Sequence, residues 1–108
     1  MKLHNIKMHV GEFGGLLSKV TEKIPKLDFV FIDGNHRKES TIKYFEACLE
    51  KKHNDTIMVF DDIYWSRGMQ QAWDQIKSHP EVTVSIDLFR VGIVFFRKEL
   101  SKQDFVLR

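Results

Sequence analysis

Two short apolar runs of the sequence are each followed by aspartate. Asp33 follows residues 29–32, and Asp61 and Asp62 follow residues 57–60. If both runs are neighbouring strands of a parallel sheet, their carboxyl ends meet at one edge, which is where such sheets bind ligands. Three carboxylates at one edge would suit Mg²⁺ or another divalent cation. The alternative interpretation is that Asp33 and Asp62 cap the helices or turns that follow them.

A histidine stands close to the first of these aspartates. His36 follows Asp33 by three residues, and an imidazole beside carboxylates can act as a general base because its pKa lies near neutrality. A solvated loop histidine is the alternative. The other histidines have no metal-ligand spacing and are expected at the surface: His4, His9, His53 and His79.

Aromatic side chains and one thiol complete the set of chemically informative residues. Tyr64 and Trp65 follow the acidic pair and could form a wall for a planar ligand, or pack under the next helix. Trp73 and Cys48 fall on apolar helical stripes. Both are expected in the core, and a buried thiol is expected to be inert.

Residues 11–15, with the sequence GEFGG, resemble a dinucleotide-binding turn only in part. Phe13 stands where the G-x-G-x-x-G fingerprint needs a glycine, and its bulk would block a pyrophosphate. A nucleotide-binding half-domain that uses these residues is therefore a minor hypothesis, under which Gly14→Val would abolish nucleotide binding. The sequence has no P-loop, nucleophile elbow or C-x-x-C pair, so nucleotide hydrolysis, serine hydrolysis and structural zinc lack their usual markers.

Alternating strands and helices must position these side chains. Apolar periodicity predicts helices over residues 13–24, 42–49 and 69–76, the last with Ser66 as N-cap and Pro80 beyond its end. The continuous runs 29–32 and 57–60 predict strands covered on both faces. The second helix is expected to end at residues 51–53, before a turn at Asn54 and Asp55.

Two further strand regions flank this central pattern. Residues 6–10 alternate between apolar and polar and predict a half-exposed edge strand. Val82, Val84 and Ile86 alternate with polar residues, and residues 91–96 are again apolar. Together they predict a closing hairpin around residues 88–90. The whole pattern indicates an α/β fold.

Length and charge narrow the class of protein. The chain has 108 residues, 17 basic and 15 acidic, for a net charge of +2, which indicates one globular domain. The near-neutral balance argues against nucleic acid or an anionic membrane as partner. No apolar run is long enough to cross a bilayer, and no signal peptide opens the chain. A single cysteine fits a reducing compartment, so the expected location is the cytoplasm.

Three strings of the sequence carry a resemblance to a known family. DFVFIDGNH (28–36), VFDDIYWSRGMQQAWDQIK (59–77) and VTVSIDLFRVGIVFFR (82–97) resemble the C-terminal half of class I S-adenosylmethionine-dependent methyltransferases. The closest likeness is to small-molecule O-methyltransferase-like proteins, and it covers residues 11–97. The resemblance implies a partial Rossmann-like sheet, mostly parallel, with a C-terminal antiparallel hairpin and helices on the faces. The strand that ends the chain's hairpin is expected beside the strand over residues 57–60.

The resemblance also implies roles for individual residues. Metal-dependent members hold Mg²⁺ through acids at the positions of Asp33, Asp61 and Asp62. The same likeness makes His36, with Asp33, the expected catalytic pair for deprotonating a hydroxyl of a small-molecule methyl acceptor. The methyl donor, S-adenosylmethionine, is expected to contact four residues: Gly11, Glu12, Asp33 and Gly34.

The resemblance leaves part of the family fold without a counterpart. Neither the glycine-rich turn after the family's first strand nor the acid that ends its second is found, so residues 1–108 are expected to form one domain that lacks these strands. Residues 29–32 would then have an open edge, which a homodimer, a strand exchange or a missing N-terminal half could cover. The alternative function is a non-catalytic, truncated domain that acts as a dimerisation or interaction module.

Overall fold

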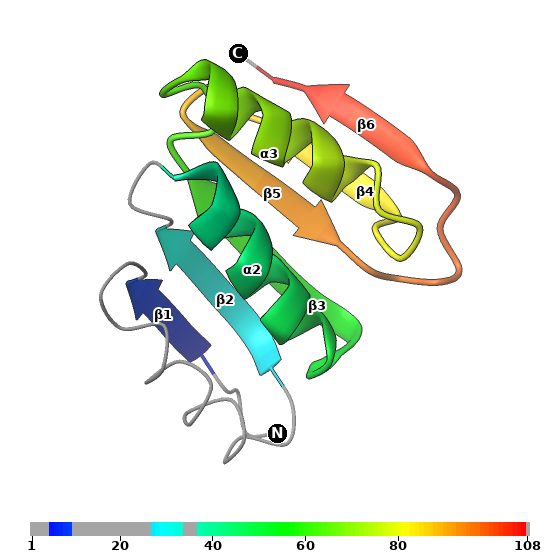
Figure 1. The fold of residues 1–108 in the computed structure, drawn as a ribbon. Coiled ribbons are helices and arrows are strands. Elements are labelled where there is room, and N and C mark those ends of the chain that lie inside the picture. Colours follow the sequence, from blue (N-terminus) through cyan, green and yellow to red (C-terminus); the bar gives the residue numbers. More distant parts are fainter. Residues whose placement is uncertain (1–4, 10–26, 34–36, 108) are drawn as a thin grey trace.

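A mixed six-stranded sheet with two helices on one face forms the part of the chain that the structure describes (Figure 1). The computed structural model describes residues 5–9, 27–33 and 37–107, with side chains for 29–32 and 37–107. The elements are β1 (Asn5–His9), β2 (Leu27–Asp33), α2 (Lys38–Leu49), β3 (Lys52–Asp61), α3 (Arg67–Lys77), β4 (Val84–Asp87), β5 (Val91–Phe95) and β6 (Gln103–Val106). The helix predicted over residues 13–24 lies outside the described residues.

The order of the strands confirms the α/β prediction. The sheet runs β1-β2-β3-β5-β4-β6, with β1, β2 and β3 mutually parallel and β5 antiparallel to both β3 and β4. The β4–β5 hairpin is the predicted one, and β5 lies beside β3 as expected. The arrangement is that of a partial Rossmann-like sheet. None of the helices within the described residues is long and apolar enough to span a membrane.

The expected open edge at residues 29–32 was wrong. β1 pairs with β2 in parallel register, from Asn5 opposite Phe29 to His9 opposite Asp33. The prediction failed because it took the strand order of the whole family, in which another strand occupies this place. The prediction that the N-terminal strand lies at the edge was correct, because β1 is the outermost strand on this side.

A side-chain hydrogen bond stabilises the first turn of each of the two described helices. Ser66 caps α3, because its hydroxyl accepts a hydrogen bond from the backbone N–H of Met69 at 3.1 Å. The predicted apolar stripe of α3 is buried against the sheet. α2 begins four residues earlier than its periodicity predicted, and its first turn is closed by the Thr41 hydroxyl, which donates to the carbonyl of Arg37 at 2.8 Å.

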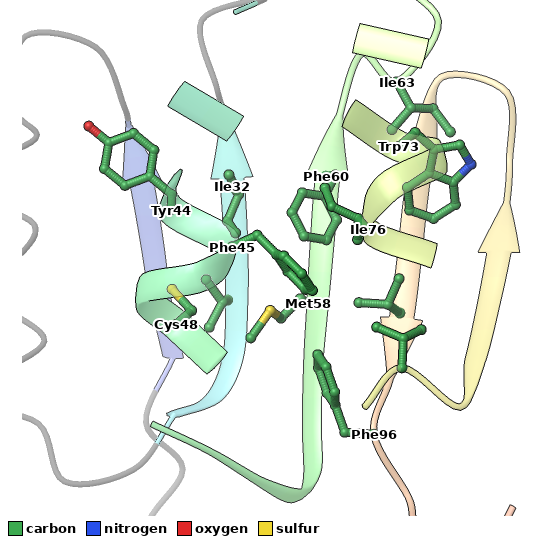
Figure 2. Close-up of a cluster of buried hydrophobic side chains, with 13 residues drawn as sticks. Ile32, Tyr44, Phe45, Cys48, Met58, Phe60, Ile63, Trp73, Ile76 and Phe96 are labelled. Carbon is green, nitrogen blue, oxygen red and sulfur yellow. The ribbon is translucent and has the colours of Figure 1, made fainter. Parts of the chain in front are cut away.

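The core lies between the helices and the face of the sheet that they cover (Figure 2). Phe45 of α2 meets Phe60 of β3 edge-on, with 5.8 Å between ring centroids, and Phe60 in turn lies 6.3 Å from Trp73 of α3. Gly92 of β5 lies beneath Trp73, so close that a Cβ atom there would be 2.5 Å from the indole ring. At this point the core consists of aromatic rings in contact with one another, and no space is left for an additional atom on residue 92.

Two local predictions differ from the structure. Asn54 and Asp55 are part of β3 rather than a turn, but they lie where the register with β2 shifts, between the pairs Leu27–Lys52 and Phe29–Ile57. Backbone N–H groups there bond to nearby side chains, as when Asp55 donates to the His53 imidazole at 3.1 Å. β6 was not predicted at all. It pairs in parallel with β4, and its four residues are exposed.

Candidate functional site

The carboxyl ends of β2 and β3 lie side by side, as the sequence predicted (Figure 1). Ile32 pairs with Phe60, so Asp33 and Asp61 follow at the same level on adjacent strands, about 5 Å apart along the hydrogen-bonding direction. On the other side of β2, His9 is the register partner of Asp33. Nothing in the spacing of the sequence indicated that His9 would reach this edge.

Asp61 and Asp62 form a half-buried pair of carboxylates at this edge. Asp62 has a left-handed backbone conformation, with φ of 55°, and its N–H donates both to its neighbour's carboxylate, at 3.0 Å, and to the carbonyl of Arg90, at 2.8 Å. The guanidinium of Arg90 stands 3.9 Å from the Asp62 carboxylate. Ser66 rather than Asp62 caps α3, so the helix-capping alternative for Asp62 is wrong.

The two aromatic residues after the acidic pair lie in different environments. Tyr64 rests against the edge of the core and stacks on Phe89, with ring centroids 5.5 Å apart and planes inclined by 19°. Trp65 is 64% exposed, so it does not pack under α3. The structure thus adds Phe89, from the turn between β4 and β5, to the aromatic wall that was considered for Tyr64 and Trp65.

Asp87 is the residue at this edge that sequence reasoning missed. The residue is only 3% exposed, and its carboxylate accepts hydrogen bonds from the hydroxyl of Tyr64 and, at 2.7 Å, from the N–H of Phe89. Alternation taken by itself favours burial of the apolar residues of β4, Val84 and Ile86. The structure instead buries Ser85 and Asp87 on the helix-covered face and leaves the two apolar residues half-buried on the other.

Hydrogen bonds, which the alternation of residue types does not reveal, explain why Ser85 and Asp87 rather than the apolar residues of β4 are buried. The Ser85 hydroxyl donates to Asp104 of β6 at 2.5 Å, and Asp87 finds two donors in the neighbouring loops. Buried polar groups with partners are tolerated in a core. An acid at the end of a strand, followed by a short turn, was the available signal for Asp87.

Cys48 and Trp73 are buried in the core, as predicted. Cys48 is fully buried and Trp73 is 2% exposed. Burial raises the pKa of the Cys48 thiol to about 12. A thiol with such a pKa is almost entirely protonated at neutral pH, so it is not a nucleophile.

Several predicted site residues lie outside the described residues: Gly11, Glu12, Gly34 and His36. Asp33 is placed by its backbone in β2 alone. Among the side chains that the structure does describe, no three His, Cys, Asp or Glu residues gather closely enough to hold a metal ion. Asp61 and Asp62 are the two predicted metal ligands whose side chains are described.

Comparison with known families decides what kind of domain this edge belongs to. A family model described as a methyltransferase domain matches residues 3–63, more than half of the chain. The chain belongs to this methyltransferase family. The matched stretch includes β1, β2, α2 and β3, and therefore the carboxyl edge with Asp33, Asp61 and Asp62. No curated protein matches the chain significantly.

Membership of the methyltransferase family gives the edge a chemical context. S-adenosylmethionine is the usual methyl donor of such domains, and the family match supports a methyltransferase-like function for this chain. The carboxyl ends of parallel strands are the usual ligand-binding edge of these sheets. In this methyltransferase domain that edge carries two carboxylates, an arginine and a stacked pair of aromatic rings.

Proposed function

We propose that this methyltransferase domain transfers the methyl group of S-adenosylmethionine to a hydroxyl oxygen of a small molecule. The observation that carries the proposal is the alignment of Asp33 with Asp61 on adjacent parallel strands within the part of the chain that matches the family. Carboxylates at this place can bind and orient ligands at the open end of the sheet.

The carboxylate set suits a divalent cation such as Mg²⁺, which we include in the proposal. Asp61 and Asp62 are adjacent and half-buried, and Asp33 ends β2 at the same level as Asp61. These are the hard oxygen donors that Mg²⁺ prefers. Arg90 stands near Asp62, but its side chain is 83% exposed and is free to turn towards solvent. When bound, the cation lowers the pKa of a coordinated hydroxyl, and the donor supplies the methyl group.

The remaining roles in this proposal fall to residues around Asp33. His36, which follows Asp33 by three residues in the sequence, accepts the proton of the acceptor hydroxyl, because an imidazole is the side chain best able to take a proton near neutral pH. The methyl donor contacts Gly11, Glu12, Asp33 and Gly34. Holding donor and acceptor in line is the main contribution of such a site to the rate.

Calorimetric titration tests the proposal. The chain, extended by the coding sequence upstream of Met1, is titrated with S-adenosylmethionine and with Mg²⁺, and the same titrations are repeated on Asp61→Asn and Asp62→Asn. We expect donor binding by the unaltered chain, and a loss of Mg²⁺ affinity of about tenfold or more in each variant because a charged oxygen ligand is removed. Asp55→Asn is the matched control, since Asp55 is exposed and bonds to Arg97 elsewhere. Absence of donor binding would overturn methyl transfer, and unchanged Mg²⁺ affinity would overturn the metal site.

We also propose that the chain corresponds to the C-terminal portion of a methyltransferase fold. The support for this is that β5 follows β4 in the chain but lies between β3 and β4, which is how the last strand of the resembling family is placed beside its fifth. The genomic sequence upstream of the codon for Met1 provides a simple test. A strand followed by a glycine-rich turn encoded there is the expected result, and unrelated sequence there would contradict the proposal.

One observation favours a second candidate function, a dimerising module. β6 is the outermost strand on its side of the sheet, its residues are exposed, and Phe105 and Val106 are 44% and 61% exposed. An exposed apolar edge strand is able to pair with a second copy. Light scattering after size-exclusion chromatography should then show a dimer that Val106→Lys dissociates. A monomer at all concentrations would exclude this candidate.

A further inference from the structure

Two loops meet at the carboxyl edge, and each contains a residue in the left-handed backbone region. Asp62 has φ of 55° and Phe89 has φ of 71°, and no other non-glycine residue in the described ranges has a positive φ. The loops are joined directly, because Asp62 donates its N–H to the carbonyl of Arg90 at 2.8 Å. Strained backbone of this kind persists where the surroundings fix it, and it concentrates at functional sites.

The strain at Phe89 is the more costly of the two. The N–H of Arg90 donates to the carbonyl of Leu88 at 2.8 Å, which closes a γ-turn around Phe89 in its rare form with positive φ. Glycine adopts a positive φ readily, whereas a bulky aromatic residue does not. The sequence therefore holds a phenylalanine ring where the backbone disfavours it, and Phe89 remains 56% exposed.

The neighbouring side chains fix this ring rather than bury it. Asp87 accepts the N–H of Phe89 at 2.7 Å and also binds the hydroxyl of Tyr64. The two rings stack at 5.5 Å, so one buried carboxylate orients both members of the pair. The pair is also tied to the carboxylates, because Tyr64 follows Asp62 by two residues and Phe89 precedes Arg90, the partner of Asp62.

We propose that the Tyr64–Phe89 ring pair is the specificity-determining surface of the site, which receives a flat aromatic methyl acceptor, and that Asp87 is its positioning residue. The inference deepens the proposed function and rests on it. A flat ring stacks well on an aromatic pair, whereas a puckered saturated ring loses much of this contact. A hydroxyl on that flat ring would lie towards the carboxylates of Asp61 and Asp62 at the carboxyl end of β3.

The experiment compares two probes that differ in flatness. The chain is titrated with 2-naphthol and with decahydro-2-naphthol, followed by NMR shifts of backbone amides, in the unaltered chain and in Phe89→Gly, Phe89→Ala and Phe105→Ala. We expect the unaltered chain to bind the flat probe about tenfold more tightly. Both Phe89 variants should lose this preference, whereas Phe105→Ala, at an exposed phenylalanine of β6, should keep it.

Thermal unfolding separates ligand binding from a merely structural role. Glycine relieves the strain at residue 89 and alanine does not, so Phe89→Gly should unfold at a higher temperature than Phe89→Ala although both lose the preference for the flat probe. Asp87→Asn should keep both rings but weaken the preference, with broadened amide signals at residues 88–90. A preference that persists in Phe89→Gly, or that falls only in proportion to the unfolding temperature, would overturn the proposal.

Titration with the methyl donor keeps this proposal distinct from the proposed function. Donor binding without a preference for the flat probe would overturn the role of the ring pair alone. A ring preference that depends on Phe89, in a chain that does not bind S-adenosylmethionine even when extended by the upstream coding sequence, would overturn methyl transfer and leave an aromatic-binding site at this edge.

Discussion

Aromatic side chains occupy two contrasting regions of this methyltransferase domain. Under the helices, Phe60 and Trp73 are 1% and 2% exposed and meet other rings edge-on or at a tilt (Figure 2). At the carboxyl edge, Trp65 and Phe89 are 64% and 56% exposed. The first group lies on regular helix and strand backbone, whereas Phe89 occupies a strained turn.

The difference separates residues that stabilise the fold from residues that are available to a ligand. Buried rings contribute through the apolar surface removed from water and through close packing. An exposed ring on a strained turn, such as Phe89, contributes little to stability, so its placement there is better explained by contact with something outside the chain. Substitutions in the two regions should therefore differ in their effect on the stability of the fold.

The largest expected effect is the protection of the buried Cys48 thiol from alkylation. Burial raises the pKa of Cys48 to about 12 from the ordinary value of 9.0, so iodoacetamide should label the native thiol about a thousandfold more slowly than the thiol of the urea-unfolded chain. Mass spectrometry of quenched samples measures both rates. Equal rates would show that the core opens freely.

The same shift in the pKa of Cys48 sets a dependence of stability on pH. The neutral thiol is favoured in the folded state, so its contribution is complete below pH 9.0 and declines as the pH rises towards about 12. Urea midpoints should therefore fall between about pH 8 and about pH 10.5. Cys48→Ala should show a smaller decline, and an identical decline would assign the effect to other groups.

The next largest effect should follow from crowding the core at Gly92. A Cβ atom there would lie 2.5 Å from two ring atoms of Trp73, so Gly92→Ala should lower the free energy of unfolding by about 3 kcal/mol. Urea denaturation followed by circular dichroism measures it. Gly68→Ala is the control, because its Cβ would meet only ordinary contacts at 3.6 Å or more, and it should change stability by no more than about 1 kcal/mol.

A moderate effect is expected at the hydrogen bonds that hold the ring pair. Tyr64→Phe and Asp87→Asn each remove part of the contact between the Tyr64 hydroxyl and the buried carboxylate, so each should lower stability by about 1 to 2 kcal/mol. The double variant should lose less than the sum of the two, with a coupling of about 1 kcal/mol. Strict additivity would show that the two groups do not interact in solution.

The smallest effect should be that of removing Trp65, the most exposed aromatic ring among the side chains that the structure describes. Trp65→Ala should change the free energy of unfolding by less than about 0.5 kcal/mol, because Trp65 is 64% exposed. Acrylamide should quench the fluorescence of Trp65 strongly and that of the buried Trp73 weakly, which comparison with Trp65→Phe resolves. A large loss of stability in Trp65→Ala would remove the contrast between the two aromatic regions.

The sequence predicted the helices and strands best where a single residue or the spacing of apolar residues determined the local structure. Ser66 and Pro80 bounded α3, and the stripe that includes Trp73 gave its buried face. The continuous runs at residues 29–32 and 57–60 became parallel strands in contact. These features depend on local chemistry or on uniform burial, which a single sequence records directly.

The features that escaped prediction depend on pairing between distant segments. Burial of Asp87 requires donors from the loops at Tyr64 and Phe89, and the alternation of β4 alone pointed to the opposite face. The pairing of β1 with β2 and the addition of β6 likewise depend on which strand edges are open. The sequence did place Asp33 and Asp61 correctly at one edge. That prediction required only that each ends a strand and that the two strands are parallel neighbours.

The position of β5 between β3 and β4 has a consequence for the order in which the chain assembles. Because β5 follows β4 in sequence but lies next to β3, the sheet is not completed strand by strand. The β4–β5 hairpin is the local unit, and local contacts form faster than distant ones. During synthesis, the edge of β3 that β5 covers stays open until residues 91–95 have left the ribosome. That interval is when this protein is most exposed to mispairing.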